Sequence, residues 1–373
     1  MKHQESLYRN MDFIDLNRQY VQLKDEIDKA IHRVLDHGRY IMGPEIHELE
    51  DALASFVGVR HCVTAASGTD SLEIALRAWS IGPGDEVITV PFTWISSAEV
   101  VSLVGATPVF VDIDLDTYTM DLDQIEAAIT PRSKAIMPVS LFGLMPDYSG
   151  INAIAEKHNL PVLEDGAQSF GATLNGIRSC GMTTAGSTSF FPAKPFGCYG
   201  DGGALFTNDD RLAERFRTIR SHGGLQRHHH TCVGMNGRFD TIQAAILLAK
   251  FPSFPEEVSA RTKVGERYSS LLSDICATPH VPEGRLHVYA QYTIRSHERE
   301  KLAEHLKAHG IPTAVYYPKC LHEQPVFKQL GYKVGDFPAA EKASREVISL
   351  PMHPWLEDSE QERVVSCVRE FFE

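Results

Sequence analysis

The sequence predicts an α/β protein whose large domain has a mainly parallel, mixed sheet between helices, followed by a smaller C-terminal α+β domain. The first observation is that short apolar runs alternate with segments of helical period from about residue 61 to residue 165. Such alternation predicts crossover units whose helices cover both faces of a mostly parallel sheet. The second observation is that the regular alternation of strands and helices ends near the two prolines of FPSFPEE. We therefore expect one domain at residues 1–250 and a second at residues 251–373.

Apolar periodicity and stop signals place the expected elements. One helix is expected at residues 19–38, where Gly38 supplies a stop. Another is expected at 44–57, where Pro44 suits the first turn and Gly58 ends the helix. A helix from about residue 69 and a long helix after the domain boundary are also expected. The expected strands are HCVTA at 61–65, EVITV at 86–90, PVFVD at 108–112, KAIMPV at 134–139, PVLED at 161–165 and VYAQYTI at 288–294.

Composition excludes several classes of protein. The formal charge of -13 argues against a general nucleic-acid binder, which needs a basic face. The sequence contains no run of about eighteen apolar residues, the length needed to span a membrane. The N-terminal MKHQESLYRNMDF lacks the apolar core of a secretion signal. The seven cysteines are scattered without a CxxC pair, which is typical of reduced thiols in the cytoplasm. His228 to His230 are adjacent and have no acidic or thiol partner at ligand spacing, so we expect no metal.

A turn of small residues, Ala66-Ser67-Gly68-Thr69-Asp70, lies between an expected strand and an expected helix. Free N–H groups at a helix start, with the helix dipole behind them, favour a phosphate dianion. Gly68 would let the backbone approach the ligand closely, and Thr69 would add a hydroxyl donor. An ordinary helix N-cap would use the same residue types, so this turn alone does not predict a phosphate site.

The second candidate group is Glu164-Asp165-Gly166-Ala167-Gln168, directly after the apolar run PVL. An acid at the carboxyl end of a parallel strand lies at the rim where open α/β sheets bind ligands. A carboxylate there can pair with a protonated pyridine nitrogen. Asp165 is the expected partner because it ends the strand, whereas Glu164 points to the other face. A helix cap is the alternative role for Asp165.

The third candidate is Lys194, in the small, apolar and glycine-rich stretch STSFFPAKPFGCYGDGG. Desolvation lowers the pKa of an amine, and the neutral amine is the form that makes a Schiff base. Ser189 could reach the same phosphate as Thr69, and Trp94 in Pro91-Phe92-Thr93-Trp94 could stack on a cofactor ring. A surface-loop lysine and a core aromatic are the alternatives.

At these residues the sequence resembles the DegT/StrS family of sugar aminotransferases, which have the aspartate-aminotransferase (fold type I) architecture. The resemblance runs from Asp12 to the C-terminus. The stretches that carry it are GPGDEVITVPFTWISSAEVVSLVGATPVFVDID, EDGAQSFGA and TSFFPAKPFGCYGDGGALFTND. Together they are far more specific than any one of the motifs.

The resemblance implies pyridoxal 5'-phosphate as the cofactor. It also implies that Lys194 forms the Schiff base and then acts as the base in the 1,3-proton shift of a ping-pong reaction. Asp165 would hold the ring nitrogen, Gln168 would contact the ring hydroxyl, and Trp94 would stack on the ring.

Further roles follow from the same resemblance. Gly68, Thr69 and Ser189 would bind the cofactor phosphate. Asn236, in VGMNGRFD, matches a residue that family members extend across the dimer interface to the partner's phosphate. A site shared in this way implies an obligate homodimer.

Within the family the chain resembles the 3-aminotransferases for UDP-2-acetamido-2-deoxy-3-oxo-D-glucuronate, which act in surface-polysaccharide synthesis with glutamate as the expected donor. Arg238 is placed to bind the sugar carboxylate, or that of the donor, because a carboxylate suits a planar charged fork. That group tends to have His-Tyr-Pro where this chain has Tyr316-Tyr317-Pro318. Tyr316 could supply a hydroxyl in place of the imidazole.

Three alternatives stay open. The substrate could be another 3- or 4-keto nucleotide sugar, including a deoxy sugar. A sugar 3-dehydratase of the same family has histidine at the lysine position, so Lys194 argues against that activity. A non-catalytic regulator that kept the fold is opposed by the presence of Lys194, Asp165, Gln168 and Ser189 together.

Overall fold

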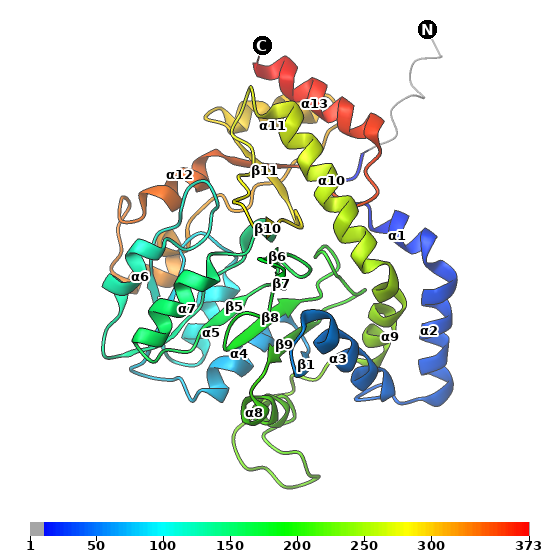
Figure 1. Ribbon diagram of the computed structural model, residues 1–373, viewed down its shortest axis with the longest axis vertical. Coiled ribbons are helices and arrows are strands. Elements are labelled where there is room, and N and C mark those ends of the chain that lie inside the picture. The colour runs from blue at the N-terminus through cyan, green and yellow to red at the C-terminus, as the bar shows by residue number, and fades with distance from the viewer. Residues whose placement is uncertain (1–10, 373) are drawn as a thin grey trace.

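A computed structural model of the protein describes residues 11–372. The expectation about a secretion signal falls largely on residues 1–10, which lie outside the described residues. Among the helices that are described, none combines the length and the apolar character needed to cross a membrane. Figure 1 shows a central sheet covered by helices, with a C-terminal part at one end of the molecule.

Two sheets that share an edge form the centre of the protein. Strands β3, β2 and β4 pair in that order and are all parallel. Single parallel bridges join β4 and its extension to β5, at Ile136 with Val162 and at Val139 with Asp165. The second sheet continues from β5 through β8 and β9 to β1. The strands are β1 (His61–Ala65), β2 (Glu86–Thr89), β3 (Thr107–Phe110), β4 (Ser133–Ile136), β5 (Leu163–Asp165), β8 (Ala185–Ser189) and β9 (Gly203–Thr207).

The expected mainly parallel, mixed sheet is confirmed, and its antiparallel pairs lie at the β1 side of the sheet. β1 pairs antiparallel with β9, and β9 pairs antiparallel with β8. The apolar pattern of 61–65 predicts a buried strand but carries no information about the direction of its partner. The sheet is therefore mixed, and it is parallel from β3 through β8.

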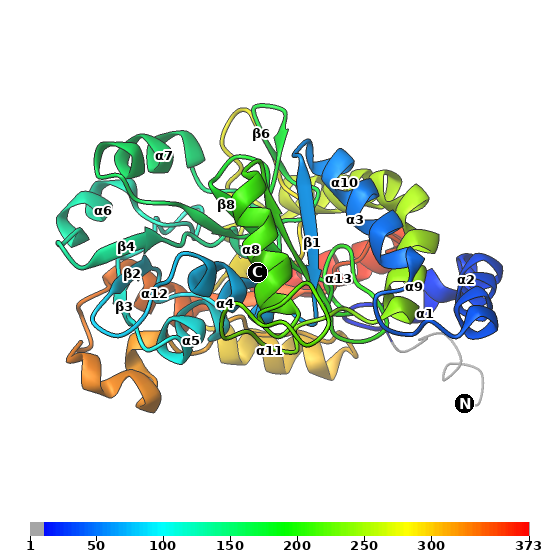
Figure 2. The same cartoon turned by 90° about the horizontal axis from the view of Figure 1, so that it is seen from below.

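Helices cover this sheet on both faces, and the N-terminal helices form an outer layer. The single helix expected at 19–38 is divided at Leu23, which ends α1 and precedes α2. The helix expected at 44–57 is α3, and Gly58 follows it in the left-handed conformation at φ 86°. Figures 1 and 2 both show α2 lying along α9. The helices are α1 (Leu16–Gln22), α2 (Lys24–His37), α3 (Pro44–Val57), α4 (Gly68–Ala78), α5 (Ser96–Leu103), α6 (Leu122–Ala128), α7 (Tyr148–Lys157), α8 (Asp210–Arg220) and α9 (Thr241–Lys250).

The C-terminal part begins with the long helix α10 and contains a hydrophobic cluster of its own around Tyr268, Tyr292 and Leu350. Residues from Cys320 to Val347 instead join the large cluster that includes Ile46. The division at residue 250 stays a prediction. The elements are α10 (Phe254–Leu272), β11 (Tyr292–Arg295), α11 (Arg299–Ala308), α12 (Pro338–Glu346), β12 (Val347–Leu350) and α13 (Asp358–Phe372); β6 (Thr173–Leu174), β7 (Ile177–Arg178) and β10 (Arg285–Leu286) form a small third sheet.

The strand expected at 288–294 was only partly right. β11 starts at Tyr292 and pairs antiparallel with β12. The preceding residues are held by another segment, since the N–H of Val288 donates to the carbonyl of Gly143 at 3.1 Å. Only the second half of the alternating pattern therefore forms a strand. The first residue of the pattern, Val288, bonds to the turn at Gly143.

Candidate active site

Lys194 lies on a loop that follows β8, and buried aromatic rings fix both ends of that loop. Phe190 and Phe196 are almost fully buried. Their ring centroids lie 6.3 Å and 5.8 Å from that of Phe170. Inside the loop the N–H of Lys194 donates to the carbonyl of Phe191 at 2.9 Å. The side chain of Lys194 thus extends from a short turn whose ends are anchored in the core.

The amine of Lys194 is partly buried, and its surroundings favour the neutral form. Burial lowers its pKa below the ordinary lysine value, and attraction by Asp165 opposes this shift. The two side chains are close enough to interact electrostatically, although they form no direct ion pair. This placement brings together the two groups on which the sequence interpretation depends most.

Asp165 ends β5 at the carboxyl edge of the parallel part of the sheet, and its side chain is 6% exposed. Its Oδ2 accepts a hydrogen bond from the Ser97 hydroxyl at 2.7 Å, and its Oδ1 accepts one from the Ala167 N–H at 3.2 Å. Burial raises the pKa of Asp165, while these two hydrogen bonds and Lys194 lower it. Among residues 11–372 no cation forms an ion pair with this carboxylate. A buried acid without a cationic partner is suited to a protonated ring nitrogen.

Glu164 precedes Asp165 and has different surroundings, as expected from alternation along a strand. Its carboxylate accepts hydrogen bonds from the Ser179 hydroxyl at 2.5 Å, the Cys180 N–H at 2.8 Å and the Ser140 hydroxyl at 3.0 Å. Burial raises the pKa of Glu164 to about 7. Both of its carboxyl oxygens are hydrogen-bonded within the protein, which leaves Asp165 as the acid available to a ligand.

Gln168 is 4% exposed, and two hydrogen bonds fix its amide. The N–H of Phe142 donates to Oε1 at 2.7 Å, and Nε2 donates to the hydroxyl of Tyr317 at 3.1 Å. Because a backbone N–H can only donate, the atom facing Phe142 must be the amide oxygen. Nε2 carries two hydrogens, so one remains for a ligand hydroxyl.

Trp94 is 57% exposed, so it is no core aromatic. Its ring centroid lies 5.9 Å from that of Tyr317, at an interplanar angle of 40°. Tyr316 and Tyr317 are half-buried, and burial raises the pKa of both hydroxyls. The indole face is therefore accessible beside the residue that holds Gln168.

The start of α4 and the end of β8 lie against each other. Ser67 caps α4, since its hydroxyl accepts from the N–H of Asp70 at 3.0 Å. The N–H groups of Gly68 and Thr69 precede the first intrahelical hydrogen bond of this helix. A Cβ added at Gly68 would lie only 2.7 Å from the Cβ of Ser189. Gly68 and Ser189, and with them the adjacent Thr69, therefore lie close together and form one cradle. The Thr69 hydroxyl lies 2.8 Å from the Ser96 hydroxyl.

The segment that carries Arg238 passes this cradle. The carbonyl of Gly237 accepts from the N–H of Ala66 at 2.9 Å, and the ring centroid of Phe239 lies 5.9 Å from that of Phe190. Arg238 is half-buried, and its Nε is buried without a hydrogen-bond partner among the described residues. A guanidinium in that state is suited to an anionic ligand.

Asn236 is exposed, and its backbone pairs with that of Ser221. No hydrogen bond joins its side chain to the described residues of the cradle. The segment between α8 and α9 that contains it protrudes beyond α8 (Figure 1). The backbone of Asn236 therefore passes close to the cradle, since the adjacent Gly237 bonds to Ala66, while its exposed side chain makes no hydrogen bond there.

Two contacts of the site carry no signal in the local sequence. Ser97 bonds Asp165 from α5, and the N–H of Phe142 orients Gln168 from a turn after β4. Each contact joins segments that are tens of residues apart. Only the position of Ser97 within the family-like stretch after Trp94 marks it for attention.

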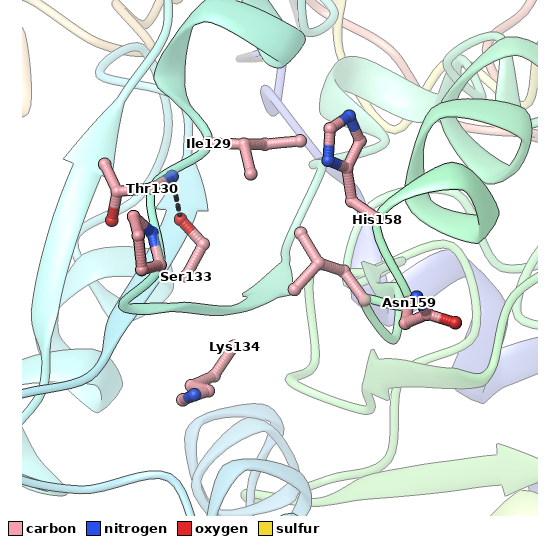
Figure 3. A pocket seen from close by; sticks show the side chains of 8 residues that line it. Ile129, Thr130, Ser133, Lys134, His158 and Asn159 are labelled. Atoms are coloured by element: carbon pink, nitrogen blue, oxygen red, sulfur yellow. Dashed lines mark hydrogen bonds between the residues drawn. The ribbon is translucent and has the colours of Figure 1, made fainter.

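A separate cavity of about 460 Å³ lies at the opposite end of the strands. Figure 3 shows Ser133 and Lys134 lining it together with His158 and Asn159, and the Thr130 N–H donating to the Ser133 hydroxyl at 3.0 Å. Ser133 begins β4, whereas the candidate residues follow the carboxyl ends of the strands. Open α/β sheets bind ligands at the carboxyl ends, so this cavity is not the candidate site.

The residues present fit pyridoxal phosphate. A partly buried amine of lowered pKa lies near a buried acid that has no cationic partner. A Cβ at Gly68 would fill the cradle. Glycine leaves this space open, so the backbone N–H groups can approach a phosphate closely.

Comparison with known proteins agrees with this geometry. The family model for the DegT/DnrJ/EryC1/StrS aminotransferase family matches residues 21–369. A UDP-2-acetamido-2-deoxy-3-oxo-D-glucuronate aminotransferase from Pseudomonas aeruginosa is 53% identical over 348 residues, which cover 93% of this chain and 96% of the relative.

Solved structures show the same fold. DesV from S. venezuelae, in complex with a ketimine intermediate, has a TM-score of 0.96 at 39% identity over 98% of this chain and 99% of that chain. Spr1654 from Streptococcus pneumoniae, in its PLP-form, has a TM-score of 0.88 at 27% identity over 93% and 95% of the two chains. The predicted aspartate-aminotransferase-like fold is confirmed. The chain belongs to the DegT/DnrJ/EryC1/StrS family, and it is an aminotransferase that depends on pyridoxal phosphate.

Proposed function

We propose that this enzyme moves an amino group from L-glutamate to C3 of UDP-2-acetamido-2-deoxy-3-oxo-D-glucuronate, in the synthesis of a surface polysaccharide. The observation that carries the reaction type is the partly buried Lys194 amine beside the buried Asp165 carboxylate. The choice of sugar rests on the Pseudomonas aeruginosa relative and on Arg238, whose buried Nε has no partner among residues 11–372.

Bound pyridoxal phosphate would supply an electron sink for the carbanion that forms at the amino-bearing carbon. In our proposal the Lys194 Nζ takes the proton from the α-carbon of glutamate. In the second half-reaction the same amine would give a proton to C3 of the sugar. The amine is suited to this work because burial lowers its pKa and keeps a larger neutral fraction near neutral pH.

The other residues of the proposed site would orient and hold the cofactor. Asp165, fixed by Ser97 at 2.7 Å, would keep the ring nitrogen protonated. Gln168 would donate its remaining N–H to the ring hydroxyl, and Trp94 would cover the ring face. The phosphate would lie in the cradle of Gly68, Thr69 and Ser189, with the dipole of α4 behind it.

We further propose that the enzyme is a homodimer in which Asn236 of one protomer binds the phosphate held by the other. Three features support this: Asn236 is exposed, its segment protrudes in Figure 1, and nearby Leu225 and Val233 are 57% and 84% exposed. Exposed apolar side chains on a protruding segment are typical of a protein interface.

Substitution of Lys194 tests the reaction type. Lys194→Ala should lower glutamate-dependent transamination by at least about 100-fold, because the proton transfers lose their base. The measurement is the rate of 2-oxoglutarate formation with the keto sugar in excess. Lys134→Ala, which removes an exposed lysine far from the site, is the matched control and should keep normal turnover. Undiminished turnover in the folded Lys194→Ala protein would contradict the proposal.

A substrate pair tests the sugar. Wild-type enzyme should prefer the 3-keto uronate to the matching 3-keto sugar with a C6 hydroxyl, because leaving the buried Nε of Arg238 without a carboxylate partner costs about 1–3 kcal/mol. Arg238→Gln should reduce this preference, measured as the ratio of kcat/KM for the two sugars. If the ratio is unchanged while kcat/KM for glutamate falls, Arg238 binds the donor and the sugar remains open. A wild-type preference for the uncharged sugar would overturn the assignment of a uronate.

A further inference from the structure

Two histidines of α11 and one glutamate of α13 form a group far from the candidate active site. His305 lies in the last turn of α11, and His309 is the residue that ends this helix, one turn further along. Glu370 lies in the last turn of α13. Figure 1 shows α11 and α13 together at the C-terminal end of the molecule. Residues four apart on a helix share a face, so both imidazoles can reach the same point.

The three side chains converge closely. Each side chain offers one ligand atom, a ring nitrogen from each histidine and a carboxylate oxygen from Glu370. These three atoms lie within 4.8 Å of one another. The two imidazole centroids are 4.5 Å apart, and His309 Nε2 is 4.0 Å from Glu370 Oε2. Nitrogens bound to one zinc ion at about 2.0–2.1 Å would be about 3.4 Å apart in a tetrahedron. The side chain of Glu370 is 64% exposed, so a rotation of it can make up the difference.

Backbone carbonyls already orient both rings. The Nε2 of His305 lies 3.1 Å from the carbonyl of Cys367, and the Nδ1 of His309 lies 2.9 Å from the carbonyl of His305. Carbonyl oxygens only accept, so each of these nitrogens carries a proton, and in the neutral ring the opposite nitrogen has the lone pair that a metal needs. A histidine that donates one N–H to a carbonyl and offers the other nitrogen is the arrangement usual for metal ligands.

We propose that His305, His309 and Glu370 bind a divalent transition-metal ion such as Zn²⁺, which joins α11 to the C-terminal helix α13. Two imidazoles and one carboxylate favour zinc over calcium or magnesium, which prefer oxygen ligands. Three protein ligands leave one tetrahedral position for water. Because the site lies outside the transamination machinery, the ion would stabilise the C-terminal part and not take part in the reaction. The expectation of no metal rested on His228 to His230, which belong to a different segment.

Hydrogen exchange with Zn²⁺ tests this assignment on the tag-free holoenzyme. ZnCl₂ should slow amide exchange in peptides from α11 and from α13 together, because one ion ties the two helices. His309→Gln should abolish this protection and weaken Zn²⁺ binding at the site by at least about tenfold. Glu370→Gln should weaken it as well. Transamination by both variants should stay normal without added metal.

The control is His297→Gln, which changes a histidine whose side chain is 83% exposed on the same part of the chain. This variant should keep full Zn²⁺ protection of α11 and α13. Zinc bound at His228 to His230 would slow exchange between α8 and α9 instead, so peptide location separates the two sites. Unchanged exchange in α11 and α13, or equal protection in His309→Gln, would overturn the proposal.

Discussion

The two neighbouring carboxylates of β5 differ in what surrounds them. Asp165 accepts one hydroxyl and one N–H, whereas Glu164 accepts from two serine hydroxyls and the N–H of Cys180. The pKa of Glu164 is raised to about 7 by burial, despite these donors. A carboxyl that holds its proton in the folded state but loses it when unfolded makes stability depend on pH.

The sign of this dependence follows from the two pKa values. Between the ordinary pKa of 4.5 and about 7, the folded state holds a proton that the unfolded state releases, so stability is lost as pH rises through this window. Glu164→Gln removes the titration. The melting temperature of the variant relative to wild type should therefore rise from pH 5 to pH 7.5, by an amount equivalent to at most about 3 kcal/mol. Calorimetry at several pH values measures it, and a constant difference would show that Glu164 is ionised throughout.

At the residue level, sequence alone could predict the groups proposed to carry chemistry but not the groups that hold them. Lys194 lies in a small, apolar and glycine-rich stretch, which is unusual for a surface lysine. Asp165 directly follows an apolar run that predicts a buried strand. Ser97 and Phe142 could not be assigned, because their contacts with Asp165 and Gln168 depend on how distant elements pack. Trp94 could be read as core or site, and only its 57% exposure decides against the core.

At the scale of elements, the close approach of α4 and β8 predicts a strict limit on side-chain size. A Cβ at Gly68 would lie 2.7 Å from the Ser189 Cβ, so Gly68→Ala must push the helix start away from the strand end. We expect pyridoxal phosphate to bind about tenfold or more weakly, since overpacking costs about 1–3 kcal/mol. Cofactor titration followed by absorbance measures this change.

Gly82→Ala is the matched control for this prediction. The nearest atom to a Cβ at Gly82 is the carbonyl oxygen of Val104 at 3.6 Å, which is an ordinary contact. This variant should bind the cofactor normally. Equal affinities in both variants would show that the cradle tolerates a methyl group.

Element boundaries were predictable where capping signals are local. Pro44 and Gly58 bound α3 as their backbone preferences require. The direction of β1 was not predictable, because its antiparallel partner β9 lies more than a hundred residues away. The same holds for Val288, whose hydrogen bond to Gly143 replaces the expected strand pairing.

At the scale of the whole molecule, the proposed dimer predicts complementation between an inactive variant and an impaired one. A Lys194→Ala chain keeps Asn236, and an Asn236→Ala chain keeps Lys194. In a mixed dimer, one site would receive Lys194 from one chain and Asn236 from the other. Unfolding and refolding an equal mixture should restore up to about a quarter of wild-type activity, since half of the dimers are mixed and each has one intact site.

The readout is turnover of the refolded mixture against each variant refolded alone. Asn236→Ala alone should be impaired, because the phosphate loses one ligand. Activity of the mixture equal to the mean of the two single variants would mean that Asn236 serves its own chain's site or none. The sequence could suggest this partnership only through resemblance, since one chain's pattern contains no information about its neighbour.

Gln168 joins three distant stretches of the protein through one amide. It accepts from Phe142, donates to Tyr317, and follows Asp165 by three residues. Tyr317 in turn lies against the exposed ring of Trp94. If Gln168 binds the ring hydroxyl as proposed, a tilt of the ring would displace this amide and with it the hydroxyl of Tyr317. In the proposed site, one uncharged side chain would therefore tie the orientation of the cofactor ring to the aromatic residues Tyr317 and Trp94.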